Sequence, residues 1–401
     1  MSSLNFMEKL LDGVEVEWKT LDEVCYVKNG YTPSKNKPEF WSNGTVPWFR
    51  MEDIRKNGRV LSDSVQHVTD KAVKSGKLFP ANSIILSTTA TIGEYALITN
   101  DFLCNQQLTV LSIKEKFKNI VNHKYLFYYS YIFGELCKMN VSPGGFALVG
   151  TTKIKTFEIP IPPLHVQSEI VRILDNFTEL TAELTAELTA RKKQYTYYRD
   201  KLLTFEDGEV EFKPLGEVAQ YSKARISAEF LNNKNYVGVD NLLQNRAGKV
   251  DSNHVPTEGN STKFVNDDIL IGNIRPYLKK IWFADCEGGT NGDVLVIHIS
   301  DKRINPKFLF QVLSDDRFFD FNMQHAKGAK MPRGDKSQIL NYSIPIPSLE
   351  EQEKIVSILD KFDTLTNSIS EGLPKEIELR TKQYEYYRDL LLTFPKQNMK
   401  V

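Results

Sequence analysis

The stretch IPIPPLHVQSEIVRILDNF, residues 159–177, returns as IPIPSLEEQEKIVSILDKF at residues 344–362, a displacement of 185. A second stretch, QYTYYRDKLLTF (194–205), returns as QYEYYRDLLLTF (383–394), a displacement of 189. Solenoid repeats have periods of about 20 to 50 residues. A period of about 190 residues therefore predicts two similar domains instead of a repeat array.

Each half of the chain contains the same order of segments. It opens with VEWKTLDEV (16–24) or VEFKPLGEV (210–218), which are typical of strands, and continues through a variable stretch of roughly 130 residues. An IPIP boundary, a long helical pattern and LLTF follow. Because FMEKLL (6–11) resembles the RDKLL that ends the first helical pattern, we expect a circular pseudo-twofold arrangement in which the two chain ends meet.

The segment after the first IPIP boundary predicts one long helix. Its apolar side chains follow the heptad spacing of a coiled coil, namely Ile170, Leu174, Phe177, Leu184, Leu188, Tyr195, Tyr198 and Leu202. Two copies of TAEL lie inside it at 181–188, and each lengthens a helix by about 6 Å. In the second half, Gly372 and Pro374 predict a break. The seam fits either core packing or an antiparallel coiled coil between two domains.

The variable stretches conserve apolar residues and change the residues between them. SIILSTTATIGEYALI begins at Ser83, and DILIGNIRPYLKKIWFA begins at Asp268, a displacement of 185. The middle changes from TTATIGE to NIRPYLK. This pattern is expected when two related domains present different side chains to different ligands.

Short apolar runs such as SIILS, DILIG, LTVLSI and DVLVIHI predict strands in each domain. The sequence therefore predicts an α+β fold with two similar globular domains separated by a long antiparallel coiled coil. We expect a first globular domain at 1–158, a central helix at 159–206, a second globular domain at 207–343 and a C-terminal helical region at 344–401.

The composition excludes several classes of protein. Lys plus Arg and Asp plus Glu both number 51 in 401 residues, so a uniformly basic nucleic-acid coat is excluded and a local basic face is not. The four cysteines form no CxxC pair, so no zinc cluster or disulfide framework is predicted. No signal peptide and no apolar run of about 18 residues is found, which predicts a cytoplasmic location and no membrane segment.

Catalytic motifs are also missing from the sequence. It contains no GxxxxGK[ST], GxGxxG, HExxH or GxSxG, no Asn-Pro-Pro-aromatic methyltransferase motif, and no clustered histidines. Glu17-Trp18-Lys19 is similar to the ExK motif of a metal-dependent nuclease, but Glu211-Phe212-Lys213 at the same place in the second half indicates a structural strand. We therefore predict no catalytic residue and no metal site.

Basic side chains gather in loops that contain Gly or Pro. Such loops suit contacts to DNA phosphates, and an Arg can pair with a guanine. We predict that DNA is bound by Ser34, Lys35, Lys37 and Lys153, which follows a loop with Gly144 and Gly145, and by Arg275, Lys279, Lys327, Lys330, Arg333 and Lys336. Arg275 is the candidate for base recognition. Each cluster by itself also fits a solvated surface.

Aromatic residues suggest other roles. The run YLFYYSYIF (125–133) is helix-like and predicts buried core instead of a base-stacking surface, whereas Trp41 and Trp48 are expected near a surface turn. Tyr and Arg are frequent in protein interfaces. The repeated QYxYYRD segments therefore predict two partner-docking patches, made of Tyr197, Tyr198 and Arg199 and of Tyr386, Tyr387 and Arg388.

The order VEWKTLDEV, NGYTPSKNKPEFWSNGTVPW, IPIP, QSEIVRILD, TAELTAEL and YYRDKLLTF, repeated in a second half, resembles the specificity subunit of type I restriction-modification enzymes. The resemblance covers essentially the whole chain. The TAEL insert and the spacer around EGLPKEIELR are most similar to the IC subgroup.

The resemblance implies that each variable domain is a target-recognition domain for one half of an asymmetric bipartite site in double-stranded DNA. It implies no active site and no cofactor in this subunit. The implied partners are two methyltransferase subunits, which use S-adenosylmethionine, and two restriction/translocase subunits, which use ATP and Mg. A coiled-coil scaffold or adaptor that binds proteins is the alternative, and salt-dependent DNA binding separates the two.

Overall fold

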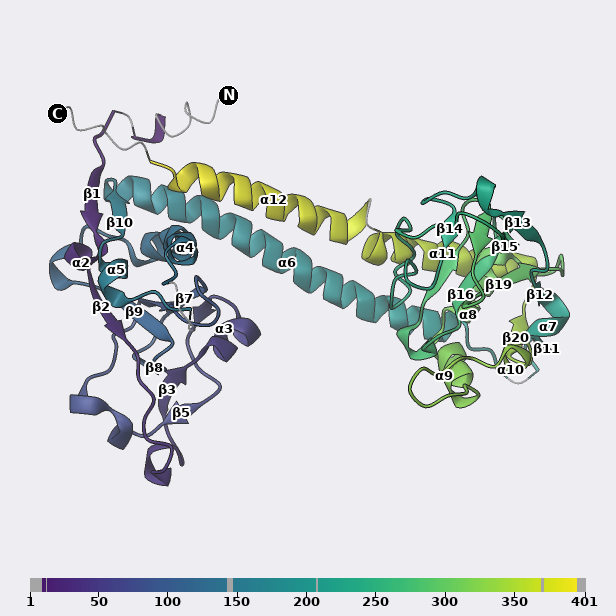
Figure 1. Ribbon diagram of the computed structural model, residues 1–401, viewed down its shortest axis with the longest axis horizontal. Helices are drawn as coiled ribbons and strands as arrows, with labels where there is room; N and C mark the ends of the chain where they lie inside the picture. The colour runs from purple at the N-terminus through teal and green to yellow at the C-terminus, as the bar shows by residue number, and fades with distance from the viewer. Residues whose placement is uncertain (1–8, 12, 143–146, 207, 369–370, 395–401) are drawn as a thin grey trace. The chain divides into compact units, whose positions relative to one another are not determined.

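The computed structural model describes residues 9–11, 13–142, 147–206, 208–368 and 371–394 (Figure 1). The chain divides into two compact units: unit 1 contains residues 1–182 and 379–401, and unit 2 contains residues 183–378. Unit 1 thus combines the start of the chain with its end.

Unit 1 is built on a five-stranded sheet of order β2-β9-β6-β7-β4, a three-stranded sheet β5-β3-β8 and the pair β1-β10. Its strands are β1 (Glu17–Thr20), β2 (Cys25–Asn29), β3 (Val46–Phe49), β4 (Val60–Leu61), β5 (His67–Val68), β6 (Ser83–Ser87), β7 (Tyr95–Ile98), β8 (Leu103–Cys104), β9 (Leu108–Ile113) and β10 (Glu158–Ile161). Its short helices are α2 (Leu21–Val24), α3 (Met51–Asn57) and α5 (Thr151–Lys155), and α4 (His123–Met139) packs on β6 and β7.

Unit 2 repeats this plan. The order β12-β19-β16-β17 corresponds to β2-β9-β6-β7, and β11-β20 corresponds to β1-β10. The strands are β11 (Glu211–Pro214), β12 (Ala219–Tyr221), β13 (Arg225–Ser227), β14 (Tyr236–Val237), β15 (Asn260–Phe264), β16 (Ile269–Gly272), β17 (Ile281–Phe283), β18 (Gly288–Thr290), β19 (Val294–Ile299) and β20 (Ser343–Ile346). The helices are α7 (Leu215–Val218), α8 (Pro306–Leu313), α9 (Asp316–Gln324), α10 (Lys336–Ile339) and α11 (Leu349–Asn367). The predicted α+β fold with two similar domains is confirmed.

The opening segment of each half pairs with the IPIP boundary of the same half. Lys19 lies opposite Ile159 in the β1-β10 pair, and Lys213 lies opposite Ile344 in the β11-β20 pair. The prolines lie inside strands here because a two-stranded pair has free edges, where a missing N–H is tolerated. The repeated segments therefore close each unit.

Two long helical segments connect the repeats. Helix α6 (Leu164–Leu202) is continuous, whereas a break separates α11 from α12 (Gly372–Leu392). Gly372 has φ +79°, and a Cβ there would lie 2.4 Å from the carbonyl oxygen of Thr364. Since only glycine fits this left-handed position against α11, the predicted break is confirmed.

The ends of these helices contribute to the two hydrophobic cores. Leu174, near the start of α6, belongs to the core of unit 1, and Leu203, just after its end, belongs to the core of unit 2. Leu359 of α11 lies in the core of unit 2, whereas Leu391 of α12 packs in the core of unit 1 together with Leu11. Leu11, close to the start of the chain, and Leu391, close to its end, thus share one core, as the circular arrangement predicts. Phe6, Met7 and Glu8 of FMEKLL lie outside the described residues.

A buried glutamine fixes each long helical segment to the neighbouring loop. Gln167 donates to the carbonyl oxygens of Ile120 (2.8 Å) and Pro162 (2.7 Å) and accepts from the N–H of Asn122 (2.8 Å). Gln352, 185 positions later, makes the same three bonds to residues 303, 347 and 305. Both side chains are fully buried, so the duplication extends to single hydrogen bonds.

Candidate nucleic-acid interface

The loops after β6 and β16 have the same backbone geometry. We call residues 88–94 the unit-1 tip and residues 273–280 the unit-2 tip. Thr89 forms a β-bridge with Leu148, and Ile274 forms one with Arg333; both members of the second pair lie 185 positions after those of the first. The predicted scaffold is therefore retained while Leu148 is replaced by Arg333.

Both tips also contain a left-handed residue at the same place. Ala90 has φ 59° and Arg275 has φ 53°. Such a conformation is uncommon outside glycine and costs free energy, and it concentrates at functional sites. The unit-2 tip thus holds an exposed Arg side chain where the unit-1 tip holds a methyl group.

Two basic loops of unit 2 that lie far apart in the sequence form one surface. The N–H of Arg275 donates to the carbonyl oxygen of Pro332 (2.7 Å), and Lys327 and Arg333 exchange two backbone hydrogen bonds of 2.8 and 2.9 Å. The predicted DNA-binding residues at 275–279 and 327–336 therefore come together at the unit-2 tip.

Some of these cations are held by carboxylates. Lys327 lies 2.6 Å from Asp335, and Arg333 lies 3.3 Å from Asp293. The hydrogen bond from Lys327 is the largest of several that lower the pKa of Asp335. These two cations are already paired, so their net attraction for a phosphate is reduced.

The remaining cations of this surface differ in whether a carboxylate binds them. Lys279 forms an ion pair with Asp316 at 2.7 Å, and partial burial lowers its pKa. Arg275, Lys330 and Lys336 are exposed, and their side chains have no partner within the part of the chain that the structure describes. These three side chains are free to bind an anionic ligand.

The predicted residues of unit 1 lie on two elements. Ser34, Lys35 and Lys37 are exposed on the loop after β2; the ammonium of Lys37 lies 5.1 Å from the ring centroid of Phe40. Lys153 is exposed on α5, just after the segment that bridges the unit-1 tip. Residues 143–146, including Gly144 and Gly145, lie outside the described residues.

A polar cleft of about 800 Å³, which we call the tryptophan cleft, adjoins the loop after β2. It is lined by Thr32, Lys35, Pro38, Trp41, Ser42, Trp48, Arg50, Gln66, Asn105, Gln106 and Gln107. Trp48 is 3% exposed, so its predicted position near a surface turn is wrong. Trp48 lines the cleft, and its indole N–H is held by the carbonyl oxygen of Tyr31 (3.0 Å).

The amide residues of this cleft were not among the residues predicted from the sequence. Gln106 and Gln107 stand directly before β9, and the N–H of Thr88 donates to the carbonyl oxygen of Gln107 (3.1 Å). The turn at 105–107 therefore lies at the same end of the sheet as the unit-1 tip. The only available signal was a run of three amides immediately before a predicted strand.

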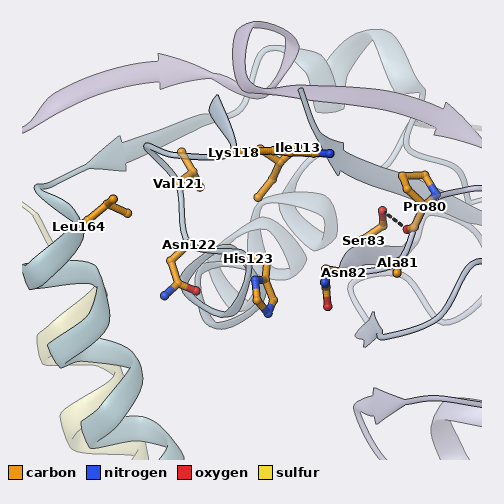
Figure 2. A pocket seen from close by; sticks show the side chains of 10 residues that line it. All are labelled: Pro80, Ala81, Asn82, Ser83, Ile113, Lys118, Val121, Asn122, His123 and Leu164. Carbon is orange, nitrogen blue, oxygen red and sulfur yellow. Dashed lines mark hydrogen bonds between the residues drawn. The ribbon is translucent and has the colours of Figure 1, made fainter. Parts of the chain in front are cut away.

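A second pocket of unit 1, of about 470 Å³, lies at the opposite end of β6. Figure 2 shows His123 and Asn82 among its lining residues, and burial lowers the pKa of His123. Unit 2 has a pocket of about 230 Å³ at the equivalent place. None of the predicted DNA-binding residues lines either pocket.

The central tyrosines of the two predicted docking patches pack inside the units. The ring of Tyr198 stacks on Phe362 with centroids 5.5 Å apart, and Tyr387 stacks on Phe177 with centroids 5.3 Å apart. Both pairs belong to the seam formed by the long helical segments. Their first role is therefore packing.

The arginines of these patches are also engaged within the chain. Arg388 lies 3.6 Å from the ring centroid of Tyr131, and Arg199 donates to the Gln311 side chain (3.3 Å). By contrast, Tyr197 is 60% and Tyr386 is 57% exposed. Each patch therefore leaves one tyrosine exposed to solvent.

Among the described residues, no group of three or more His, Cys, Asp or Glu side chains is arranged to hold a metal ion. No helix in these ranges has the length and apolarity needed to cross a membrane. The run 125–133 lies in α4, with Tyr125 and Phe133 fully buried, so its predicted core position is confirmed.

The chain thus contains two similar α+β units, each with a polar or basic surface at the end of its sheet. Residues 13–191 and 207–379 both match the family model described as the type I restriction modification DNA specificity domain. The chain belongs to this family, as its sequence resemblance indicates. Its role is DNA specificity within a multisubunit system.

Individual relatives agree over nearly the full length. The chain is 42% identical to the EcoprrI type I restriction enzyme specificity subunit of Escherichia coli, covering 92% of this chain and 93% of that subunit. It is 33% identical to the EcoR124I/EcoR124II specificity subunit of the same species, covering 99% and 98%. The solved S subunit of M. genitalium shares the fold with a TM-score of 0.58, at 16% identity, over 96% of this chain and 98% of that one. The IC subgroup stays a prediction.

Proposed function

We propose that this chain recognises a bipartite, asymmetric site in double-stranded DNA, one half by each unit. The duplicated tip carries this proposal: the same bridge and the same left-handed residue present Ala90 and Leu148 in unit 1 but Arg275 and Arg333 in unit 2. Different side chains on one scaffold suit two different half-sites. The recognition domains are those expected at 1–158 and 207–343.

The DNA contacts divide into two kinds. Exposed cations such as Lys35 and Lys330 supply phosphate attraction that depends on salt and not on sequence. Arg275 contacts a base edge, where a bidentate Arg–guanine pair discriminates by about 1 to 3 kcal/mol. Lys279, Lys327 and Arg333 contribute less because carboxylates hold them.

The helices have two functions in this proposal. The number of residues in α6 sets the unspecified gap between the half-sites, and the exposed tyrosines Tyr197 and Tyr386 contact partner subunits. The partners are two methyltransferase subunits with S-adenosylmethionine and two restriction/translocase subunits with ATP and Mg. This assembly places the protein in the cytoplasm. A protein-binding scaffold is less favoured, since the family is described by DNA specificity.

Co-expression with the methyltransferase subunit of the same system tests the proposal. We expect the complex to bind DNA with a strong salt dependence and to methylate adenines in one two-part motif with a fixed gap, mapped by sequencing of modified bases. Binding with no sequence preference, or methylation without a two-part motif, would contradict it.

A further inference from the structure

The turn before β9 differs chemically from the turn before β19. Ser87 pairs with Leu108 in unit 1, and Gly272 pairs with Val294 in unit 2, so residues 105–107 correspond to residues 291–293. Unit 1 has Asn-Gln-Gln in this turn, and unit 2 has Asn-Gly-Asp. The place of Gln106 is thus taken by Gly292, which has no side chain.

Gln106 is oriented by a residue distant in sequence. The hydroxyl of Thr32 donates to the Gln106 side-chain oxygen at 2.5 Å, across 74 positions. The side-chain oxygen retains a second lone pair, and within the described residues no partner occupies the side-chain NH₂ group of exposed Gln106. Neighbouring Gln107 is instead held by Asn105 at 3.1 Å.

The surroundings of Gln106 suit an anionic duplex. Lys35 lines the same cleft and is exposed. Arg50 lies on its wall with its guanidinium 5.6 Å from the ring centroid of Trp48, but it is paired with Glu52 at 2.8 Å, so Lys35 is the cation that attracts a phosphate. The indole N–H of Trp41 is occupied by the carbonyl oxygen of Ser34 (3.0 Å). Gln106 therefore offers a fixed acceptor and free donors beside a cation and aromatic walls.

A glutamine amide with one free acceptor position and free donors matches adenine, which presents an N6 amino donor and an N7 acceptor in the major groove. We propose that Gln106, oriented by Thr32, recognises an adenine in the half-site of unit 1, and that the tryptophan cleft receives this edge of the duplex. This inference rests on the proposed function and assigns its base-recognising residue in unit 1. Thr32 is a positioning residue, because it acts through Gln106.

The test uses the complex of the full chain with its methyltransferase subunits and a library of duplexes randomised in both half-sites. For Gln106→Ala we expect the preference for adenine at one position of one half-site to fall about tenfold or more. The other half-site and the salt dependence should stay unchanged. Gln106→Glu should move the preference at that position toward cytosine, whose amino group a carboxylate accepts.

Two further variants separate positioning from general damage. Thr32→Val removes the hydroxyl and should weaken the preference at the same position only, by less than Gln106→Ala does. Lys118→Ala, on an exposed side chain at the opposite end of the sheet, should change neither motif nor affinity. Thermal unfolding of each complex checks folding.

The outcomes distinguish a failure of the Gln106 role from a failure of the proposed function. If the wild-type complex selects a two-part motif and Gln106→Ala and Gln106→Glu select the same motif, the role of Gln106 is wrong while the proposed function stands. If the wild-type complex selects no motif, the proposed function itself fails. If Gln106→Ala alters the same half-site as Arg275→Ala, the proposal that Gln106 reads the half-site of unit 1 is wrong.

Discussion

The unit-1 and unit-2 tips share backbone geometry and differ in charge. Val149 donates to the carbonyl oxygen of Thr88 at 3.0 Å, and Gly334 donates to that of Asn273 at 3.1 Å. Around these equivalent backbone hydrogen bonds, unit 1 has amide side chains and the apolar Leu148, whereas unit 2 has arginines and lysines. Backbone hydrogen bonds do not depend on side-chain identity, so this scaffold tolerates replacement of its surface.

The same contrast appears at the opposite end of the sheets. The hydroxyls of Ser83 and Ser112 lie 2.8 Å apart in unit 1. In unit 2, Asp268 and His298 at the equivalent positions lie 2.7 Å apart. Both units thus have an interacting side-chain pair at this place, but the residue types differ. The two units therefore differ in side-chain chemistry at both ends of their sheets.

The largest effect is expected from shortening α6, which passes from unit 1 into unit 2. Deleting residues 181–184 removes about 6 Å of helix, close to two base-pair rises of about 3.4 Å. We expect methylation of the original motif to fall to background and both half-sites to reappear with a gap shorter by about one or two base pairs. Modified-base sequencing measures this. Altered half-site bases would contradict the proposal that the length of α6 sets the gap between the half-sites.

The duplicated scaffold is tested by Gln167→Ala and Gln352→Ala. Each change removes three hydrogen bonds to the backbone, one buried and two partly buried, which should lower the free energy of unfolding by on the order of 3 kcal/mol. The two losses should be similar, as measured by urea denaturation. Gln383→Ala, on an exposed side chain, is the control. A large loss for only one of the pair would show that the two units are not equivalent.

Arg275→Ala tests the unit-2 tip. We expect a loss of about 1 to 3 kcal/mol of base discrimination, confined to the half-site that Gln106 does not affect. The left-handed backbone is retained, since Ala90 adopts the same conformation in unit 1. Binding to duplexes with single-base changes measures the effect. If the affinity falls equally for all duplexes, Arg275 contacts a phosphate and not a base.

Lys330→Ala should give the smallest effect. An exposed lysine that meets one phosphate changes the slope of log K against log salt by about 1, equally for all DNA sequences. Lys279→Ala is the comparison, because its ammonium is already paired with Asp316. We expect a smaller change in slope for Lys279→Ala than for Lys330→Ala. The reverse order would show that the ion pair opens on DNA.

Several features could be predicted from the sequence because their signals are local or repeated. The displacement of 185 predicted two units, and the apolar runs predicted β6, β9, β16 and β19. Gly372 and Pro374 predicted the break between the two C-terminal helices. The loops that carry Arg275 and Lys330 were likewise visible as Gly- and Pro-containing basic segments.

The tertiary structure decided which of the predicted side chains are exposed and unpaired, and so free to contact a ligand or a partner. Asp316 and Asp335 hold Lys279 and Lys327, and Trp48 is buried. The stacking of Tyr198 on Phe362 leaves only Tyr197 exposed in its patch.

The sequence by itself determined the duplication, the fold class and the family, because periodicity and motif order are properties of the chain. The pairing of Thr32 with Gln106 could be found only in the folded molecule. A side-chain hydrogen bond needs two groups within about 3 Å, and these two lie 74 positions apart. Folding brings them together at the end of one sheet, where β2 and β9 are neighbours.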